Sequence, residues 1–283
     1  MDSKIRLPFK ESLQLVLGRA GLYERIKASW IYDAYWRVAD KRIIEDRQRE
    51  VAFYRNILEG FQGGELIFDL GANLGYKTDI FLRMGANVVA AEPDEFCQSV
   101  LRKKFTKYRM KKRPITVIGK AVSEQCSIQK MWIDAPGSAM NTLSQKWADA
   151  LRGDDKRFGQ RLNFGQWKEV ETITIEQLIV EHGLPFFVKI DVEGFELNVL
   201  RGMRRPVPYL SFEANLPEFR PEGLQCLEVL AQLAPDGSFN YSADCRRGLV
   251  LERWLGPKEF SAVFETCPEP SIEVFWKTHQ SER

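Results

Sequence analysis

The sequence predicts an α/β fold with a mainly parallel sheet, preceded by a helical N-terminal extension. From residue 66 onward, short runs rich in β-branched residues alternate with amphipathic stretches, which is typical of βαβ units. Most of these runs are almost continuously apolar, as expected for strands covered by helices on both faces. With 283 residues and 44% hydrophobic content, the chain can bury the core of one ordinary domain plus an appended helical element.

The extension is predicted first along the chain. Residues 10–60 carry apolar and aromatic side chains at helical spacing among charged ones, and Gly60 and the pair Gly63-Gly64 follow as stop signals. We therefore expect helices over residues 1–60 and one α/β domain over residues 61–283.

Six strands are predicted in the domain, namely "LIFDL", "NVVAAE", "ITVIG", "FFVKID", "YLSFEA" and "IEVFW". Helical periodicity and glycine stop signals predict helices over residues 74–84, 95–107, 175–182, 196–202 and 224–233. Two segments break the periodicity, "APGSAMNTLSQ" and "GQRLNFGQWKE". We expect both to form loops over the sheet edge.

Composition excludes several classes of protein. The 41 basic and 39 acidic residues give a net charge of +2, which is too balanced to indicate a nucleic-acid or membrane partner from bulk electrostatics. Five widely spaced cysteines form no CxxC pair, so neither a zinc site nor a disulfide framework is indicated, and the odd count fits a reducing compartment. The N-terminus lacks the apolar run of a signal peptide or membrane span. We expect a soluble, cytoplasmic protein.

The stretch "LIFDLGANLGYKTDIF" resembles phosphate-binding loops but fails their spacing rules. A P-loop has four residues between its glycines and then Lys and Ser or Thr, whereas Gly71 and Gly75 enclose three residues and Tyr76 precedes Lys77. The dinucleotide fingerprint GxGxxG also fails, because position 73 is Asn.

The acidic residues around this loop favour a cationic nucleoside without phosphate. Asp69 would repel a pyrophosphate but attract an ammonium group, and S-adenosylmethionine carries a sulfonium, an ammonium and a bare ribose. Gly71 and Gly75 would let the backbone approach this cofactor, and Glu92, at the end of the next strand, is placed to accept the ribose hydroxyls. The structural alternative is that Asp69 caps the following helix and Gly71 makes a turn.

Four segments in order, "FDLGANLGYKT", "VVAAEPD", "GKAVSE" and "KIDVEGFELNVLRGM", resemble the FkbM family of S-adenosylmethionine-dependent methyltransferases. The resemblance covers about residues 65–213 and implies the seven-stranded, Rossmann-like class I methyltransferase fold. It also implies methylation of hydroxyl groups on sugars or natural products. Carried over by position, the cofactor residues would be Asp69, Gly71, Ala72, Asn73, Gly75, Glu92, Pro93, Ala121 and Val122.

Candidate catalytic residues follow the fourth and fifth predicted strands. Lys189, Asp191 and Glu193 end the fourth and Glu213 ends the fifth, at the carboxyl edge where open α/β sheets bind ligands. Methyl transfer to a hydroxyl is helped by a base or a metal. Asp191 and Glu213 are candidates for either role, with Mg²⁺ as the metal.

Other interpretations of these charges remain. Lys189 either acts as a base with a lowered pKa or pairs with Asp191 or Glu193. The alternative for "KIDVEGFE" is that its charges only satisfy one another and that Gly194 allows close packing. The two histidines are weak candidates, since His182 fits a helix C-cap and His279 lies at the C-terminus.

Two further features leave alternatives open. The basic run over residues 102–113 is either a solvated helix face or a site for RNA or anionic lipid. Trp147 and Trp167 flank an irregular region and are either part of a lid that stacks on a sugar or core anchors.

The function predicted is transfer of a methyl group to an oxygen of a small molecule or carbohydrate. The alternatives are an RNA-modifying methyltransferase and a non-enzymatic binding protein on a methyltransferase fold. A homodimer is compatible with the sequence, which does not fix the oligomeric state.

Overall fold

The computed structural model describes residues 41–106, 108, 115–152 and 162–278. The predictions for residues 1–40, for most of the basic run after Thr106 and for His279 lie outside these residues. The chain divides into two compact units, residues 1–48 and 49–283, and the sheets and the site described below belong to the second. Helix α4 (Lys41–Ile57) falls within the predicted extension.

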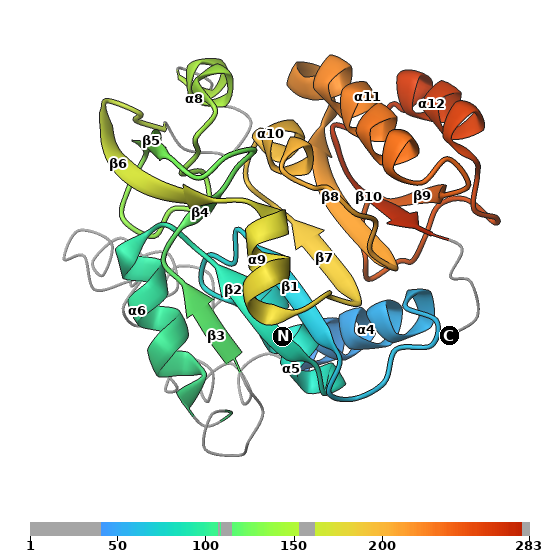
Figure 1. Ribbon diagram of the computed structural model, residues 1–283, viewed down its shortest axis with the longest axis horizontal. Coiled ribbons are helices and arrows are strands. Elements are labelled where there is room, and N and C mark those ends of the chain that lie inside the picture. The colour runs from blue at the N-terminus through green and yellow to red at the C-terminus, as the bar shows by residue number, and fades with distance from the viewer. Residues whose placement is uncertain (1–40, 107, 109–114, 153–161, 279–283) are drawn as a thin grey trace, which may run out of the picture. The chain divides into compact units, whose positions relative to one another are not determined.

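A seven-stranded sheet forms the centre of the fold (Figure 1), with the strand order β3-β2-β1-β7-β8-β10-β9. The pairs among β3, β2, β1, β7 and β8 are parallel, and β10 runs antiparallel to both β8 and β9. The bounds are β1 (Leu66–Leu70), β2 (Asn87–Ala91), β3 (Ile115–Ile118), β7 (Phe187–Ile190), β8 (Tyr209–Asn215), β9 (Ser238–Ser242) and β10 (Ser271–Lys277). The six predicted strands are confirmed.

The seventh strand, β9, was not predicted because its sequence "SFNYS" is mostly polar. Two of its polar side chains, Asn240 and Ser242, are nevertheless buried and satisfied within the protein. Asn240 donates to the carbonyl of Leu251 at 2.9 Å, and Ser242 donates to that of Gly248 at 2.7 Å. These bonds remove the usual cost of burying polar groups.

Helices cover both faces of the sheet, as the doubly wound prediction requires. One core packs residues 53–57 of α4, together with α5 and α6, against one face, and a second core packs α9, α10, α11 and α12 against the other. The bounds are α5 (Tyr76–Met84), α6 (Glu95–Lys104), α9 (Ile175–His182), α10 (Glu196–Arg201), α11 (Leu216–Leu233) and α12 (Pro257–Thr266). Across the described residues, no helix combines the length and the apolar character needed to cross a bilayer.

Three helices differ most from the prediction. Helix α11 begins at Leu216, eight residues before the predicted start, because it continues through Pro221 with a kink at Phe219. Helix α8 (Gln145–Leu151) and helix α12 were not predicted.

A smaller three-stranded sheet lies between β3 and α9 along the chain, with the order β4-β6-β5 (Figure 1, upper left). Its strands are β4 (Ala121–Val122), β5 (Ile128–Ile133) and β6 (Gln166–Ile173), and helix α8 (Gln145–Leu151) follows β5. The prediction of a loop over residues 159–169 is therefore wrong for residues 166–169. They open β6, which pairs antiparallel with β5 in a register that places Trp132 opposite Trp167.

Candidate active site

A cleft lies at the carboxyl edge of the large sheet, beside the ends of β1, β2 and β7. The strand order reverses between β1 and β7, and such a switch point is where open α/β sheets bind ligands. Six of the nine predicted cofactor residues line the cleft, namely Gly71, Asn73, Glu92, Pro93, Ala121 and Val122. The candidate catalytic residues Asp191 and Glu193 line it as well.

The loop after β1 is shaped by contacts within the protein. Gly71 has a φ of 85°, and a Cβ there would lie 1.8 Å from the carbonyl oxygen of Asp191. The backbone N–H groups of Gly71 and Ala72 both donate to the carbonyl of Ala91, at 3.0 and 3.1 Å. Glycine is thus required at position 71 by the close contact with the end of β7. The sequence interpretation had attributed this requirement to the close approach of the cofactor.

Gly75 has a similar role on the other side of the loop. Its φ is 74°, and a Cβ would lie 2.5 Å from the side chain of Leu101 and 2.6 Å from that of Phe105. Neither Gly75 nor Ala72 lines the cleft. Their predicted part in cofactor binding stays a prediction.

Asp69 is buried beneath this loop and does not line the cleft. Its carboxylate accepts a hydrogen bond from Thr78 Oγ1 at 2.5 Å. Burial raises its pKa to about 6, although the bond from Thr78 and the charge of Lys189 oppose the rise. A direct contact between Asp69 and a cationic ligand stays a prediction.

Glu92 presents a fixed, buried carboxylate to the cleft. Its Oε2 accepts the backbone N–H of Asn73 at 2.7 Å, and its Oε1 accepts that of Asp94 at 2.8 Å. Burial raises its pKa to about 7, and the two N–H donors limit the rise. Each carboxylate oxygen has a second lone pair, so the group can still accept hydroxyl donors.

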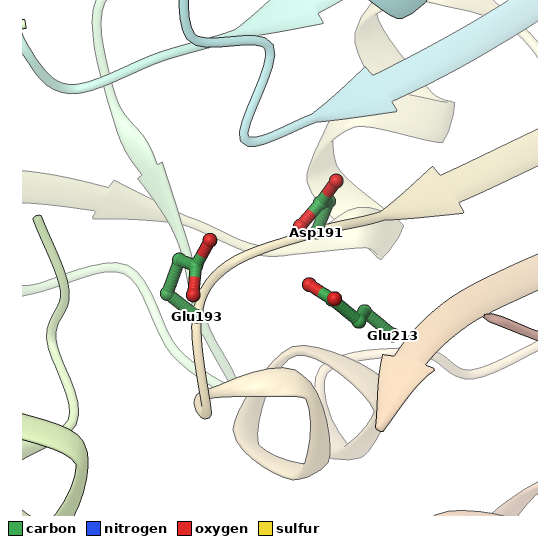
Figure 2. Close-up of side chains that lie close together, drawn as sticks. All are labelled: Asp191, Glu193 and Glu213. Atoms are coloured by element: carbon green, nitrogen blue, oxygen red, sulfur yellow. The ribbon is translucent and has the colours of Figure 1, made fainter. Parts of the chain in front are cut away.

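Three carboxyl groups lie close together beside the cleft. Figure 2 shows the side chains of Asp191, Glu193 and Glu213 converging, and one oxygen of each lies within 4.8 Å of the others. Burial first and Asp191 second raise the pKa of Glu213 to about 8. Burial and the charge of Glu213 also raise the pKa of Glu193 well above its usual value. At neutral pH the three groups therefore do not all carry a full negative charge.

Lys189 lies buried behind this cluster and does not line the cleft. Its Nζ is 3.1 Å from Asp191 Oδ2 and 3.7 Å from Glu273 Oε1. Burial alone would lower its pKa, but Asp191 and Glu273 outweigh burial and hold the pKa well above its usual value. Of the two predicted roles for Lys189, these contacts favour ion pairing, and the partner is Asp191 rather than Glu193.

The turn after β7 shows the close packing at Gly194 that the alternative interpretation of "KIDVEGFE" predicted. Glu196 Oε1 accepts the backbone N–H groups of Val192 and Gly194, both at 3.2 Å. A Cβ on Gly194 would lie 2.6 Å from the ring of Phe219. Internal contacts thus account for Lys189, Gly194 and Glu196, whereas Asp191 and Glu193 also line the cleft.

A model of the "Methyltransferase FkbM domain" family matches residues 69–221, more than half of the chain. The chain belongs to the FkbM methyltransferase family. No curated protein sequence matches it. The class I fold expected of the family is confirmed by its seven-stranded, mostly parallel sheet between two helical layers.

Solved structures of methyltransferases resemble this FkbM chain at low identity. The S-adenosylmethionine-dependent methyltransferase from Agrobacterium tumefaciens is 10% identical with a TM-score of 0.39, over 83% of this chain and 62% of that one. This chain thus spans less than two thirds of that protein. The O-methyltransferase from Bacillus cereus in complex with S-adenosylhomocysteine is 13% identical with a TM-score of 0.38, over 83% and 81% of the two chains.

The residues that line the cleft of this FkbM domain offer the polar and apolar groups that an adenosyl group needs. A ribose needs a hydrogen-bond acceptor for its two hydroxyls, which the rigid carboxylate of Glu92 supplies. An adenine ring needs an apolar wall, which Ala121, Val122 and Met131 supply. The residues present therefore fit S-adenosylmethionine, the cofactor predicted from the sequence.

One wall of the cleft was missed by the sequence interpretation. It is built from residues of the predicted loop 135–145, namely Ser138, Ala139, Asn141, Thr142 and Leu143. Asn141 holds this segment, since its Nδ2 donates to Asp94 Oδ2 at 3.2 Å and its Oδ1 accepts the N–H of Asp134 at 3.0 Å. No motif marked these residues, although their position after an irregular β-rich stretch is typical of binding loops.

The remaining candidates are His182 and the two tryptophans, Trp147 and Trp167. His182 ends α9, as predicted for a C-cap group, and does not line the cleft. Trp147 is fully buried in a small core. Of its two predicted roles, this burial fits the core anchor. Trp167 is 47% exposed on β6, with Lys130 Nζ 4.3 Å from its ring centroid.

Proposed function

We propose that this protein transfers a methyl group from S-adenosylmethionine to a hydroxyl oxygen of a sugar or another natural product. The observation that carries the proposal is the pair of acidic side chains, Asp191 and Glu193, in the same cleft as Glu92 and the loop at Gly71. The cofactor, when bound, supplies an electrophilic sulfonium methyl group. The protein's part is to orient the acceptor in line with that methyl and to receive its proton.

The proposal assigns different tasks to the two ends of the cleft. Glu92 binds the ribose hydroxyls, and Ala121 and Val122 pack against the adenine. Asp191 and Glu193 face the acceptor, and Lys189 holds the carboxylate of Asp191 in place through their 3.1 Å contact. We also propose that residues 1–60 form an extension to a methyltransferase domain over residues 61–283. A cytoplasmic location and a homodimer stay predictions.

Transfer of labelled methyl groups tests this function. The purified chain is incubated with methyl-labelled S-adenosylmethionine and a panel of monosaccharides, disaccharides, hydroxylated aromatic compounds and total RNA. We expect label in at least one hydroxylated small molecule, in a form stable to mild alkali as an ether is. Label found only in RNA would replace the proposal by the RNA-modifying alternative. Saturable binding of S-adenosylhomocysteine without any turnover would favour the non-enzymatic one.

The affinity for S-adenosylhomocysteine is expected to rise with pH through the pKa of Glu92. Ribose hydroxyls donate more strongly to an ionised carboxylate, so binding favours the ionised form. With a pKa of about 7, ionisation increases about tenfold between pH 6 and pH 8, and the dissociation constant should fall by about the same factor.

Calorimetry at the two pH values checks this expectation. Glu92→Gln should bind more weakly at pH 8 and lose most of the pH dependence. Glu171→Gln, which alters an exposed carboxylate on β6, is the control and should behave as the wild type. An unchanged pH dependence in Glu92→Gln would show that another group controls binding.

The predicted Mg²⁺ site at Asp191 and Glu213 fits the structure less well than the cofactor does. The ammonium of Lys189 is already 3.1 Å from Asp191, and Glu213 accepts a hydrogen bond from Ser271 at 2.8 Å. The carboxyl cluster therefore already has the ammonium of Lys189 as its cation and the hydroxyl of Ser271 as a hydrogen-bond donor. We expect an excess of EDTA to leave turnover unchanged, and a loss of turnover that Mg²⁺ restores would establish the metal instead.

A further inference from the structure

The turn after β7 holds Glu193 in a backbone conformation that its residue type disfavours. Its φ is 55°, in the left-handed region where a Cβ meets the following carbonyl. Among the described residues, the other non-glycine residue with a positive φ is Asn73, a residue type that tolerates this region better. Strain of this kind persists where the surroundings enforce it, and it clusters at functional sites.

Two side chains from the segment after β5 enforce this conformation. Thr142 Oγ1 donates to the backbone carbonyl of Glu193 at 2.7 Å, and Trp147 Nε1 donates to Glu193 Oε2 at 3.1 Å. Thr142 is 1% exposed and Trp147 is 0% exposed, so water does not compete with either bond. Both the backbone and the carboxylate of Glu193 are thereby fixed.

Trp147 is itself held in one orientation. Its backbone N–H donates to Oγ of Ser144, the N-cap of α8. Its ring packs edge-on against Phe219, with the centroids 5.6 Å apart, and Phe219 also packs against Gly194 in the same turn. The indole N–H is therefore presented to Glu193 by a packed core.

The other two carboxyl groups of the cluster are less suited to receive a proton from a substrate. Asp191 is paired with the ammonium of Lys189. Glu213 accepts a bond from Ser271 and does not line the cleft. Glu193 lines the cleft, and its donor Trp147 is a neutral N–H that orients the carboxylate without neutralising it.

We propose that Glu193 is the catalytic residue that receives the acceptor's hydroxyl proton, and that Trp147 and Thr142 are positioning residues that hold it at the cleft. The inference rests on the proposed function. In the step, the acceptor oxygen bonds to the methyl carbon while the carbon–sulfur bond breaks and leaves its electron pair on sulfur. The hydroxyl proton passes to the carboxylate of Glu193. The sulfonium loses its positive charge and the carboxylate its negative charge, so the charges balance.

Steady-state kinetics with S-adenosylmethionine and the most rapidly methylated compound of the panel test the proposal. We expect Glu193→Gln to lower kcat by at least about a hundredfold, with little change in the KM for S-adenosylmethionine. Trp147→Phe keeps a ring against Phe219 but removes the N–H, and it should lower kcat by about tenfold. Trp254→Phe, which changes a partly buried tryptophan that does not line the cleft, is the matched control and should leave kcat unchanged.

A second pair of variants covers the case in which Trp147→Phe fails to fold. Thr142→Val removes the hydroxyl donor at nearly constant shape, whereas Thr142→Ser keeps the donor. We expect kcat to fall in the valine variant only, with the affinity of both for S-adenosylhomocysteine within about twofold of the wild type.

The outcomes separate this inference from the proposed function. Equal kcat values for the valine and serine variants at Thr142, or for the phenylalanine variants at Trp147 and Trp254, would overturn the inference alone. Parallel losses of kcat and of S-adenosylhomocysteine affinity would show a merely structural role and would also overturn it. A wild-type protein that methylates nothing in the panel would overturn the proposed function, and this inference with it.

Discussion

Replacing Gly71 with alanine is expected to destabilise the protein by about 3 kcal/mol and to abolish measurable binding of S-adenosylhomocysteine. Gly71 has a φ of 85°, and an added Cβ would lie 1.8 Å from the carbonyl oxygen of Asp191. Neither partner can yield easily, because both are backbone groups at strand ends. The loop after β1 must therefore move away from β7, which displaces Asn73 and its hydrogen bond to Glu92.

Gly60→Ala separates the backbone strain from the collision. Gly60 has nearly the same φ, 82°, but a Cβ there would have nothing within 4 Å. The control should cost only about 1 kcal/mol and keep the affinity for S-adenosylhomocysteine. Urea unfolding measures both variants, and calorimetry measures binding. Equal losses of stability would mean that the contact with Asp191 is not what makes glycine necessary at position 71.

The parallel part of the fold could be predicted because its strands are almost continuously apolar. "LIFDL", "FFVKID" and "YLSFEA" lie in the middle of a sheet covered on both faces, where nearly every position is buried. Strands that depart from this pattern were missed. In β9, Asn240 and Ser242 are buried but satisfied by the carbonyls of Leu251 and Gly248, and no periodicity in the sequence marks such pairing.

The cofactor side of the site was the more predictable half. The position of Glu92 after β2 follows from local spacing alone, and the structure places it at the cleft. The reason for Gly71 was not predictable, because the atom it must avoid belongs to Asp191, 120 positions later. The wall that includes Thr142 was missed for a related reason, because its position depends on the hydrogen bond from Thr142 to the carbonyl of Glu193, 51 positions later.

Replacing Lys189 with methionine is expected to destabilise the protein by about 3–5 kcal/mol at neutral pH, because it leaves buried acidic groups without their cation. Lys189 is 2% exposed, and its ammonium lies between Asp191 and Glu273. Methionine keeps an apolar side chain of similar length, so the loss of unfolding free energy measures the loss of the charge rather than the creation of a cavity. Lys120→Met removes an exposed partner of Glu171 and should shift the unfolding midpoint negligibly.

The pH dependence of the Lys189→Met variant distinguishes loss of charge from loss of packing. Burial alone would raise the pKa of Glu273, but Lys189 and then Lys77 outweigh it and lower the pKa to about 2. A lowered pKa means that ionised Glu273 stabilises the wild type above its unfolded pKa of 4.5, and that this stabilisation is lost as pH falls towards 2. Without Lys189 the pKa of Glu273 rises, so the deficit of the variant in unfolding free energy should shrink as pH falls from 7 to 3. A deficit that stays constant over this range would instead show that Lys189→Met destabilises the protein through lost packing. The ion pair with Lys189 would then not be what holds Asp191 beside the cleft.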